Sequence, residues 1–209
     1  VISSKSDSNP FISLSSVDIG DFDNDGDNDI VVTDSALNRL IPIFNTPNES
    51  QQFTVGNFSN TGIAPIDIAV MDSNGDTIDD AIVVCQGDTN SLGSIDFFSV
   101  QTTSITGGFS QDGSISLGGQ PSSIDPGDVN NDKDLISFAV SQKASNSVAK
   151  GSRSSALNDS FDWELESFTS VAIGPTDIEF SDLNSDGIND VVVVCPDSDT
   201  VCILTGLVD

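Results

Sequence analysis

One pattern recurs four times in the 209 residues and constrains the fold more than any other feature. It is a short run of alternating carboxylates and amides followed by a burst of β-branched residues. The copies read DFDNDGDNDIVVT from Asp21, DSNGDTIDDAIVV from Asp72, DVNNDKDLISFAV from Asp128 and DLNSDGINDVVVV from Asp182. Their first aspartates are 51, 56 and 54 residues apart (72−21, 128−72, 182−128). A period of this order is typical of repeat architectures, in which each repeat is one supersecondary unit.

The alternation of oxygen-bearing side chains predicts a loop that binds a hard cation. Calcium takes roughly six to eight oxygens, and a short loop supplies them from positions one, three and five, a backbone carbonyl at seven and a carboxylate further on. The predicted ligands are Asp21, Asp23, Asp25, Asp29 and the carbonyl of Asp27 in the first copy; Asp72, Asn74, Asp76, Asp80 and the carbonyl of Ile78 in the second; and Asp182, Asn184, Asp186, Asp190 and the carbonyl of Ile188 in the fourth. In the second copy Thr77 stands where the others have Gly26 and Gly187, which predicts a strained turn.

The third copy departs most from the pattern. Three of its predicted ligands are in place: Asp128, Asn130 and Asp132. Lys133 takes the glycine position and Ile136 the ninth, unless a two-residue deletion lets Asp134 serve as the last ligand. We therefore expect three calcium sites, with weak or absent binding at the third copy.

A solvated acidic turn is the alternative to a metal loop, because Asp, Asn and Gly favour turns by themselves. Against it, the first copy would hold five like charges within nine residues, from Asp21 to Asp29, and these repel one another without a cation. Four copies in register also favour the metal loop over chance turn chemistry.

The residues after each loop distinguish it from an EF-hand. An EF-hand has a glutamate at position twelve and then a helix, whereas position twelve here is Val32, Val83, Ala139 and Val193. The runs IVV, AIVV, ISFAV and VVVVC predict strands buried on both faces. A short strand is predicted before each loop. Third strands are expected at 40–44, 95–100, 147–150 and 201–205, and fourth strands at 53–55, 114–117 and 163–168.

An apolar strand, a D-x-[DN]-x-D-G-x-x-D loop and a second apolar strand, repeated about every 50 to 60 residues, resemble the FG-GAP or VCBS repeat. This family is known from the β-propeller of integrin α subunits and from many secreted bacterial proteins. The resemblance covers the whole chain. It implies an all-β β-propeller of about four four-stranded blades, with each calcium loop between the first and second strands.

The resemblance also implies a single domain over residues 1–209. Its repeats are expected at approximately 14–62, 63–118, 119–172 and 173–209. The last repeat stops after its third strand, so we expect residues 1–13 to supply the fourth and close the ring, as propellers do to avoid a raw edge.

The charge of the chain bounds its partners. Thirty-three acidic residues against six basic ones give a net charge of −27, and three calcium ions would leave about −21 (−27 + 3 × 2). Nucleic acid is therefore not expected as a partner. An anionic membrane surface is not expected either, unless calcium bridges it to the chain. The sequence contains no run of 18 apolar residues, so no transmembrane helix is expected. We expect an extracellular or cell-surface location, with any signal peptide cleaved or outside this sequence.

Three cysteines bear on the redox environment. Cys195 and Cys202 flank PDSDTV, and a hairpin tight at Ser198 and Asp199 would place them directly opposite each other, within reach of a disulfide. Three small buried thiols are the alternative. Cys85 is left unpaired in either case.

The chain has no histidine and no tyrosine, and its carboxylates are mostly committed to the loops, so we do not expect an enzyme. The resemblance favours a non-enzymatic adhesion or recognition module that binds a protein or glycan ligand on a cell surface or matrix. A structural subunit of an extracellular filament or coat, binding copies of itself, is the first alternative, and Asn-x-Ser sequons at Asn48, Asn57 and Asn158 would allow glycosylation. A calcium-dependent lectin is the second, although Trp163 is expected to be packed rather than a sugar platform.

Overall fold

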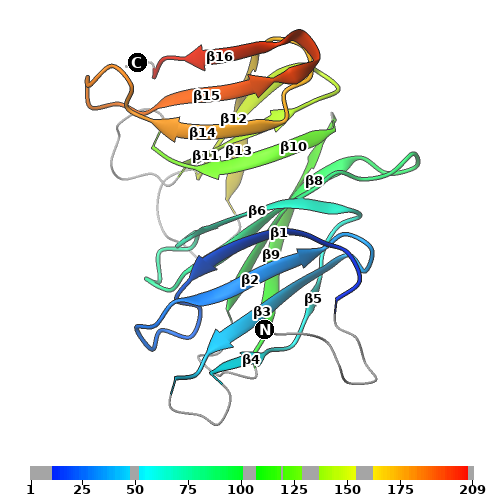
Figure 1. Cartoon of the computed structure of the whole chain (residues 1–209), viewed down its shortest axis with the longest axis vertical. Helices are drawn as coiled ribbons and strands as arrows, with labels where there is room; N and C mark the ends of the chain where they lie inside the picture. Colours follow the sequence, from blue (N-terminus) through cyan, green and yellow to red (C-terminus); the bar gives the residue numbers. More distant parts are fainter. Residues whose placement is uncertain are drawn as a thin grey trace. The chain divides into compact units, whose positions relative to one another are not determined.

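The computed structural model describes residues 11–47, 52–100, 107–118, 120–128, 137–153 and 162–206. These residues form four antiparallel sheets, one for each sequence repeat (Figure 1). The predicted all-β class is therefore confirmed. No helix in the described ranges is long and apolar enough to cross a membrane.

Each sheet follows the predicted strand order. The first sheet contains β1 (Leu14–Gly20), β2 (Asp29–Asp34), β3 (Arg39–Asn45) and β4 (Phe53–Val55), with β5 (Ser59–Asn60) also paired to β3. The second contains β6 (Pro65–Met71), β7 (Asp80–Cys85), β8 (Gly93–Val100) and β9 (Phe109–Leu117). The third contains β10 (Pro121–Pro126), β11 (Ser137–Gln142), β12 (Ser147–Arg153) and β13 (Trp163–Ser170). The fourth contains β14 (Asp177–Ser181), β15 (Asp190–Cys195) and β16 (Thr200–Leu204) among the described residues.

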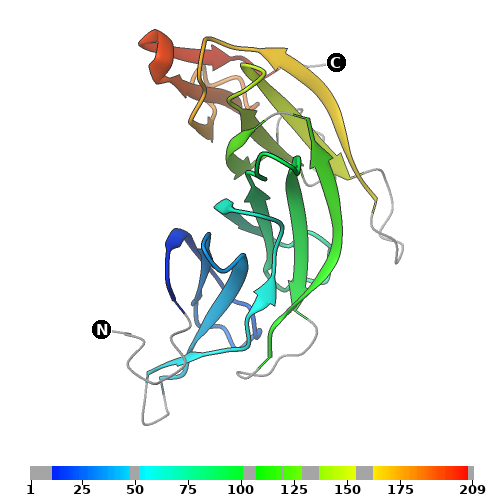
Figure 2. The ribbon, with the colours of Figure 1, turned by 90° about the vertical axis from the view of Figure 1, so that its right-hand side faces the viewer.

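The chain divides into two compact units, Val1–Ser114 and Ile115–Asp209. In the first unit, the first two sheets lie side by side (Figure 2). Their shared core includes Leu40 of the first sheet and Phe22 of the loop between β1 and β2, together with Val83 and Phe98 of the second sheet. Strands β7 and β11 are buried along their whole length, which confirms for these two the prediction that the apolar run after the loop is covered on both faces. For β15 the prediction was wrong in part, because Val194 is 41% exposed.

The second unit has a core of its own between the third and fourth sheets. Ala139 and Val148 of the third sheet pack against Ile178, Val193 and Cys195 of the fourth. The prediction of one closed domain over residues 1–209 stays a prediction.

The same polar contacts join the two sheets of each unit. Ser15 Oγ donates to the carbonyl of Pro65 at 2.7 Å, and Ser122 Oγ donates to the carbonyl of Pro175 at 2.8 Å. One further contact has the same form in both units, a carboxylate that accepts a backbone N–H of the next sheet: Asp18 from Val70 at 2.9 Å, and Asp125 from Phe180 at 2.8 Å. The two sheets within each unit are thus held in a fixed register near their first strands.

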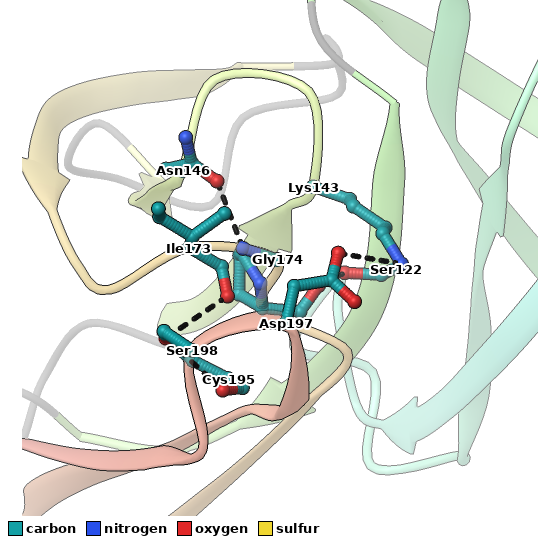
Figure 3. Close-up of polar contacts among 9 residues, drawn as sticks. Ser122, Lys143, Asn146, Ile173, Gly174, Cys195, Asp197 and Ser198 are labelled. Atoms are coloured by element: carbon teal, nitrogen blue, oxygen red, sulfur yellow. Dashed lines mark hydrogen bonds and ion pairs between the residues drawn. The ribbon is translucent and has the colours of Figure 1, made fainter.

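A left-handed asparagine makes a third recurring contact. Asn38 and Asn146 end the turns before β3 and β12 with φ of 53° and 50°, a region that Asn tolerates well. The Asn38 Oδ1 accepts the N–H of Ala64 at 2.9 Å, and the Asn146 Oδ1 accepts the N–H of Gly174 at 2.9 Å (Figure 3). Each of these asparagines ties its turn to the entrance of the next sheet.

The hairpin that carries two of the cysteines differs from the sequence-based prediction. Cys195 pairs with Thr200, and Cys202 pairs with Val193, so the two cysteines are not directly opposite each other. The prediction was wrong because the turn takes the four residues 196–199, including a 3-10 helix, rather than two. Both thiols are free, as is that of Cys85.

The start of the described chain lies against the first sheet. Phe11 packs beside an apolar cluster on β2 and β3, and the N–H of Ile12 donates to the Asp34 carboxylate at 2.5 Å. Residues 1–10 lie outside the described ranges. Completion of the fourth sheet by residues 1–13, and with it the closure of a ring, stays a prediction.

Candidate metal centre

Three of the four acidic segments fold into the same loop: the first loop (21–29), the second loop (72–80) and the fourth loop (182–190). In each, the fourth and sixth positions are left-handed. The φ values are 58° and 90° at Asn24 and Gly26, 84° and 71° at Gly75 and Thr77, and 62° and 88° at Ser185 and Gly187. Thr77 is β-branched and is therefore strained in this region, as its position in the sequence predicted.

The first aspartate of each loop organises the turn. The Asp21 carboxylate accepts the N–H of Asp25 on Oδ1 at 3.1 Å and that of Gly26 on Oδ2 at 3.0 Å. The equivalent groups are Asp72 with Asp76 and Thr77, and Asp182 with Asp186 and Gly187. The fifth residue accepts the N–H of the seventh at 2.9 Å in all three loops: Asp25 from Asp27, Asp76 from Ile78 and Asp186 from Ile188.

The ninth aspartate of each loop is buried at the start of the second strand. Asp29 accepts the N–H of Phe22 at 3.1 Å and that of Asn45, at the end of β3, at 2.7 Å. In the fourth loop Asp190 accepts from Leu183 and Gly206 in the same way, at 3.1 and 3.0 Å. The sequence pattern predicts these aspartates only as ligands and does not reveal that Asp29 and Asp190 also fasten their loops to the end of the third strand.

Asp80, the ninth residue of the second loop, is satisfied on one side only. Its Oδ2 accepts both the N–H and the hydroxyl of Ser73, at 3.0 and 2.7 Å, while its Oδ1 has no partner among the described residues. Burial raises the pKa of Asp80 to about 7, and burial likewise raises the pKa of Asp29 to about 6. Ionisation of either carboxylate in the metal-free fold is therefore unfavourable.

The first loop brings three carboxylates together. Asp21, Asp23 and Asp29 each offer an oxygen, and these oxygens lie within 4.8 Å of one another. Asp23 is only 7% exposed, and its Oδ1 has no hydrogen-bond partner in the described part of the chain. Asp25 and Asp27 are exposed, and their side chains lie outside this group. Hard oxygen donors, a buried unpartnered oxygen and raised pKa values fit a divalent cation.

The second and fourth loops have an amide where the first has Asp23. The side-chain oxygen of Asn74 accepts the N–H of Asp76, and that of Asn184 accepts the N–H of Asp186, each at 2.8 Å. An amide oxygen is also a calcium ligand, but it brings no charge.

The third segment differs at its end. Asn130, Asp132 and Asp134 lie outside the described residues, whereas Asp128 is described. The N–H of Gly127 donates to the carbonyl of Ser137, and Gly20 is paired with Asp29 at the same place in the first sheet. Ser137 therefore takes the place of the ninth aspartate. The sequence had suggested Ile136 or Asp134 for this place. The Ser137 hydroxyl donates to the carbonyl of Gly127. This segment has one residue more than the first loop (137−128 against 29−21), and it has no buried carboxylate at that register.

Comparison with known proteins identifies the fold but no family. No family model matches the chain, and no curated protein matches it. Among solved structures, BBS1N in complex with ARL6DN is 12% identical with a TM-score of 0.60, and the match covers 91% of this chain and 50% of BBS1N. A protein from Lactobacillus plantarum is also 12% identical, with a TM-score of 0.53 and coverage of 86% and 54%. The chain thus spans about half the length of both structures. BBS1N is of propeller type, so the likeness shows that the chain has a β-propeller-like all-β fold.

Proposed function

We propose that the chain is a calcium-binding module of the FG-GAP/VCBS type, with sites at the first, second and fourth loops. The observation that carries the proposal is the pair of buried, unpartnered carboxylate oxygens, Asp23 Oδ1 and Asp80 Oδ1, inside loops that close with the same hydrogen bonds. A buried carboxylate oxygen without a donor is costly, and a cation removes that cost.

In the first loop Asp21, Asp23 and Asp29 would hold the ion. Bound calcium would supply two positive charges that offset the repulsion among these carboxylates. The residues themselves provide the preformed cage, because the backbone N–H groups of Asp25 and Gly26 already orient Asp21. Since the ion binds the folded loop, it stabilises the fold by mass action.

The third segment is proposed to bind calcium weakly or not at all. Ser137 provides a hydroxyl where Asp29, Asp80 and Asp190 provide buried carboxylates. The loss of one anionic ligand weakens a calcium site, because ligand charge is one of the determinants of affinity.

We propose a non-enzymatic role in extracellular adhesion or recognition. A net charge of −27 suits a soluble module in a calcium-rich exterior, where an acidic surface is tolerated and partly neutralised. The lectin alternative is weakened by Trp163, which is 7% exposed and packs against Phe138 with ring centroids 5.3 Å apart, so this residue is not a platform for sugars.

A structural subunit that binds copies of itself is the second candidate. Apolar side chains are exposed on two strands, with Val17 and Ile19 of β1 at 62% and 58% and Val201 and Ile203 of β16 at 60% and 57%. Clustered apolar exposure favours contact with another protein surface.

Calcium titration by calorimetry tests the metal assignment. The full chain is expected to bind three ions, and Asp21→Ala, Asp72→Ala or Asp182→Ala should each remove one and lower the melting temperature in calcium. Asp128→Ala is the matched control and should change neither. Absence of calcium binding by the parent chain, or equal losses at all four segments, would refute the assignment.

Electron microscopy in calcium and after chelation separates the two roles, since compact particles indicate a recognition module and ordered polymers indicate a structural subunit.

A further inference from the structure

Asp79 connects two of the proposed calcium loops. It occupies the eighth position of the second loop, yet its carboxylate Oδ2 accepts the N–H of Asp21, the first residue of the first loop, at 2.8 Å. In return, the N–H of Asp79 donates to the carbonyl of Asp21 at 3.4 Å. Both residues belong to the first unit. The two loops are therefore joined directly at a predicted ligand of one of them.

We propose that Asp79 couples calcium binding at the first and second loops, so that an ion in either loop strengthens binding in the other. This inference rests on the proposed calcium function. Asp79 acts as a positioning residue, since it is not part of the carboxylate group formed by Asp21, Asp23 and Asp29.

On the side of the first loop, Asp79 holds the backbone of a ligand. The N–H and the carbonyl of Asp21 are both bonded to Asp79, while the Asp21 carboxylate is held by Asp25 and Gly26. The orientation of Asp21 toward Asp23 thus depends on where Asp79 lies. Residues that orient ligands from outside the coordination sphere commonly change metal affinity about 10–100-fold when they are removed.

On the side of the second loop, Asp79 directly precedes Asp80 in the chain, so their backbones move together. Asp80 is fully buried, and its Oδ1 has no partner among the described residues, which marks it as an oxygen available to an ion. When an ion fixes Asp80, it also restricts Asp79 and hence Asp21. By linkage, the effect on affinity is the same in both directions.

The chain offers a matched control at the same position of another loop. Asn189 is the eighth residue of the fourth loop, as Asp79 is of the second, and it carries no charge. Asp76 and Asp186 are exposed fifth-position ligands, so their replacement by alanine disables the second or the fourth loop with little risk to the core.

A double-mutant cycle on the full chain tests the coupling, with calcium alone as the probe. In an Asp186→Ala background, which leaves the first and second loops, disabling the second with Asp76→Ala should weaken the first about tenfold. Asp79→Ala should weaken the first loop by a similar factor, after which Asp76→Ala should have no further effect on it. Asp79→Asn, which keeps an acceptor oxygen, should restore part of the loss, and Asn189→Ala should leave the first loop unchanged.

The outcomes separate this inference from the function on which it rests. If the Asp186→Ala chain binds no calcium, the proposed function fails. If it binds two ions whose affinities are independent of each other and of Asp79, the calcium function stands and the coupling is refuted. Melting temperatures in chelator identify any variant whose fold is damaged; for such a variant, Asp79→Asn in place of Asp79→Ala decides whether the first loop still responds to the second.

Discussion

The first and fourth loops share their internal hydrogen bonds but not their surroundings. Phe22, the second residue of the first loop, is fully buried and makes an edge contact with Phe109 at 5.2 Å between ring centroids. The equivalent Leu183 is 52% exposed. Asp21 is partly buried and bonded to Asp79, whereas Asp182 is exposed. The conformation of such a loop is therefore encoded locally, while its burial depends on which residues of a neighbouring sheet cover it.

The largest expected effect of this difference is at the second residue of the two loops, Phe22 and Leu183. Phe22→Ala should lower the free energy of unfolding by about 3–5 kcal/mol, because it leaves a cavity in the core of the first unit. Leu183→Ala, the matched change in the fourth loop, should stay within about 1 kcal/mol of the parent. Chemical denaturation in calcium measures both. Similar effects at the two positions would show that Phe22 and Leu183 contribute equally to the core, which would contradict their difference in burial.

A second test uses the pH dependence of the metal-free protein. Burial raises the pKa of Asp29 from its ordinary 3.8 to about 6, so the stability associated with its protonated form is present at low pH and is lost as the pH rises through about 6. In chelator, the melting temperature of the parent should therefore fall further between about pH 5 and about pH 7.5 than that of Asp29→Asn, because this interval includes the raised pKa of Asp29.

Calcium should reverse this trend, because the ion binds the ionised carboxylate. Asp190→Asn provides the same substitution in the fourth loop as a reference for the general effect of removing one charge. A parent and an Asp29→Asn variant with identical pH profiles in chelator would be inconsistent with a buried, uncompensated Asp29.

A third test exchanges the sixth residue between loops. Thr77 has a φ of 71°, where a residue with a branched side chain is strained by about 1–2 kcal/mol. Thr77→Gly should therefore stabilise the metal-free protein by roughly 1 kcal/mol, and Gly187→Thr should destabilise it by a similar amount. Thermal melts in chelator measure both changes. If Thr77→Gly does not stabilise the protein and Gly187→Thr does not destabilise it, the turn accommodates threonine without strain.

The smallest expected effects are at the contacts that both units share. Ser15→Ala and Ser122→Ala each remove a hydroxyl that donates to a proline carbonyl of the next sheet, at a cost of about 1 kcal/mol. Equal losses in denaturation experiments would confirm that the two pairs of sheets are joined alike. A loss at only one serine would show that one of the pairs is held mainly by other contacts.

Much of the fold could be predicted from local patterns. The fourth strand expected at 53–55 coincides with β4, and the loops and second strands lie where the carboxylate and β-branched runs predicted them. These features are local because alternation and turn chemistry act within a few residues. The 196–199 turn was missed because a 3-10 helix and a left-handed residue can replace a tight turn without a distinct sequence signal.

The candidate site was predicted only in part, for a related reason. The left-handed turn at Thr77 follows from its own position in the loop, and the structure confirms a φ of 71° there. The contact between Asp79 and Asp21 joins residues 58 positions apart, and the bond from Asn45 to Asp29 spans 16. Such contacts depend on how sheets and strands pack. The extra residue before Ser137 was missed because the third segment lacks the glycine that would anchor its alignment.

The recurring serine and aspartate contacts imply that the sheets are of two alternating kinds. Strands β1 and β10 carry Ser-Ser-x-Asp, from Ser15 and Ser122. The carbonyl and N–H groups that these residues bind belong to β6 in the first unit, and to Pro175 and β14 in the second. A gene that lost the second or the third repeat would place two repeats of the same kind one after the other in the chain and leave one set of these contacts unmade. Such a chain would evolve more readily by duplicating two repeats at once, a step of 107 residues here (122−15).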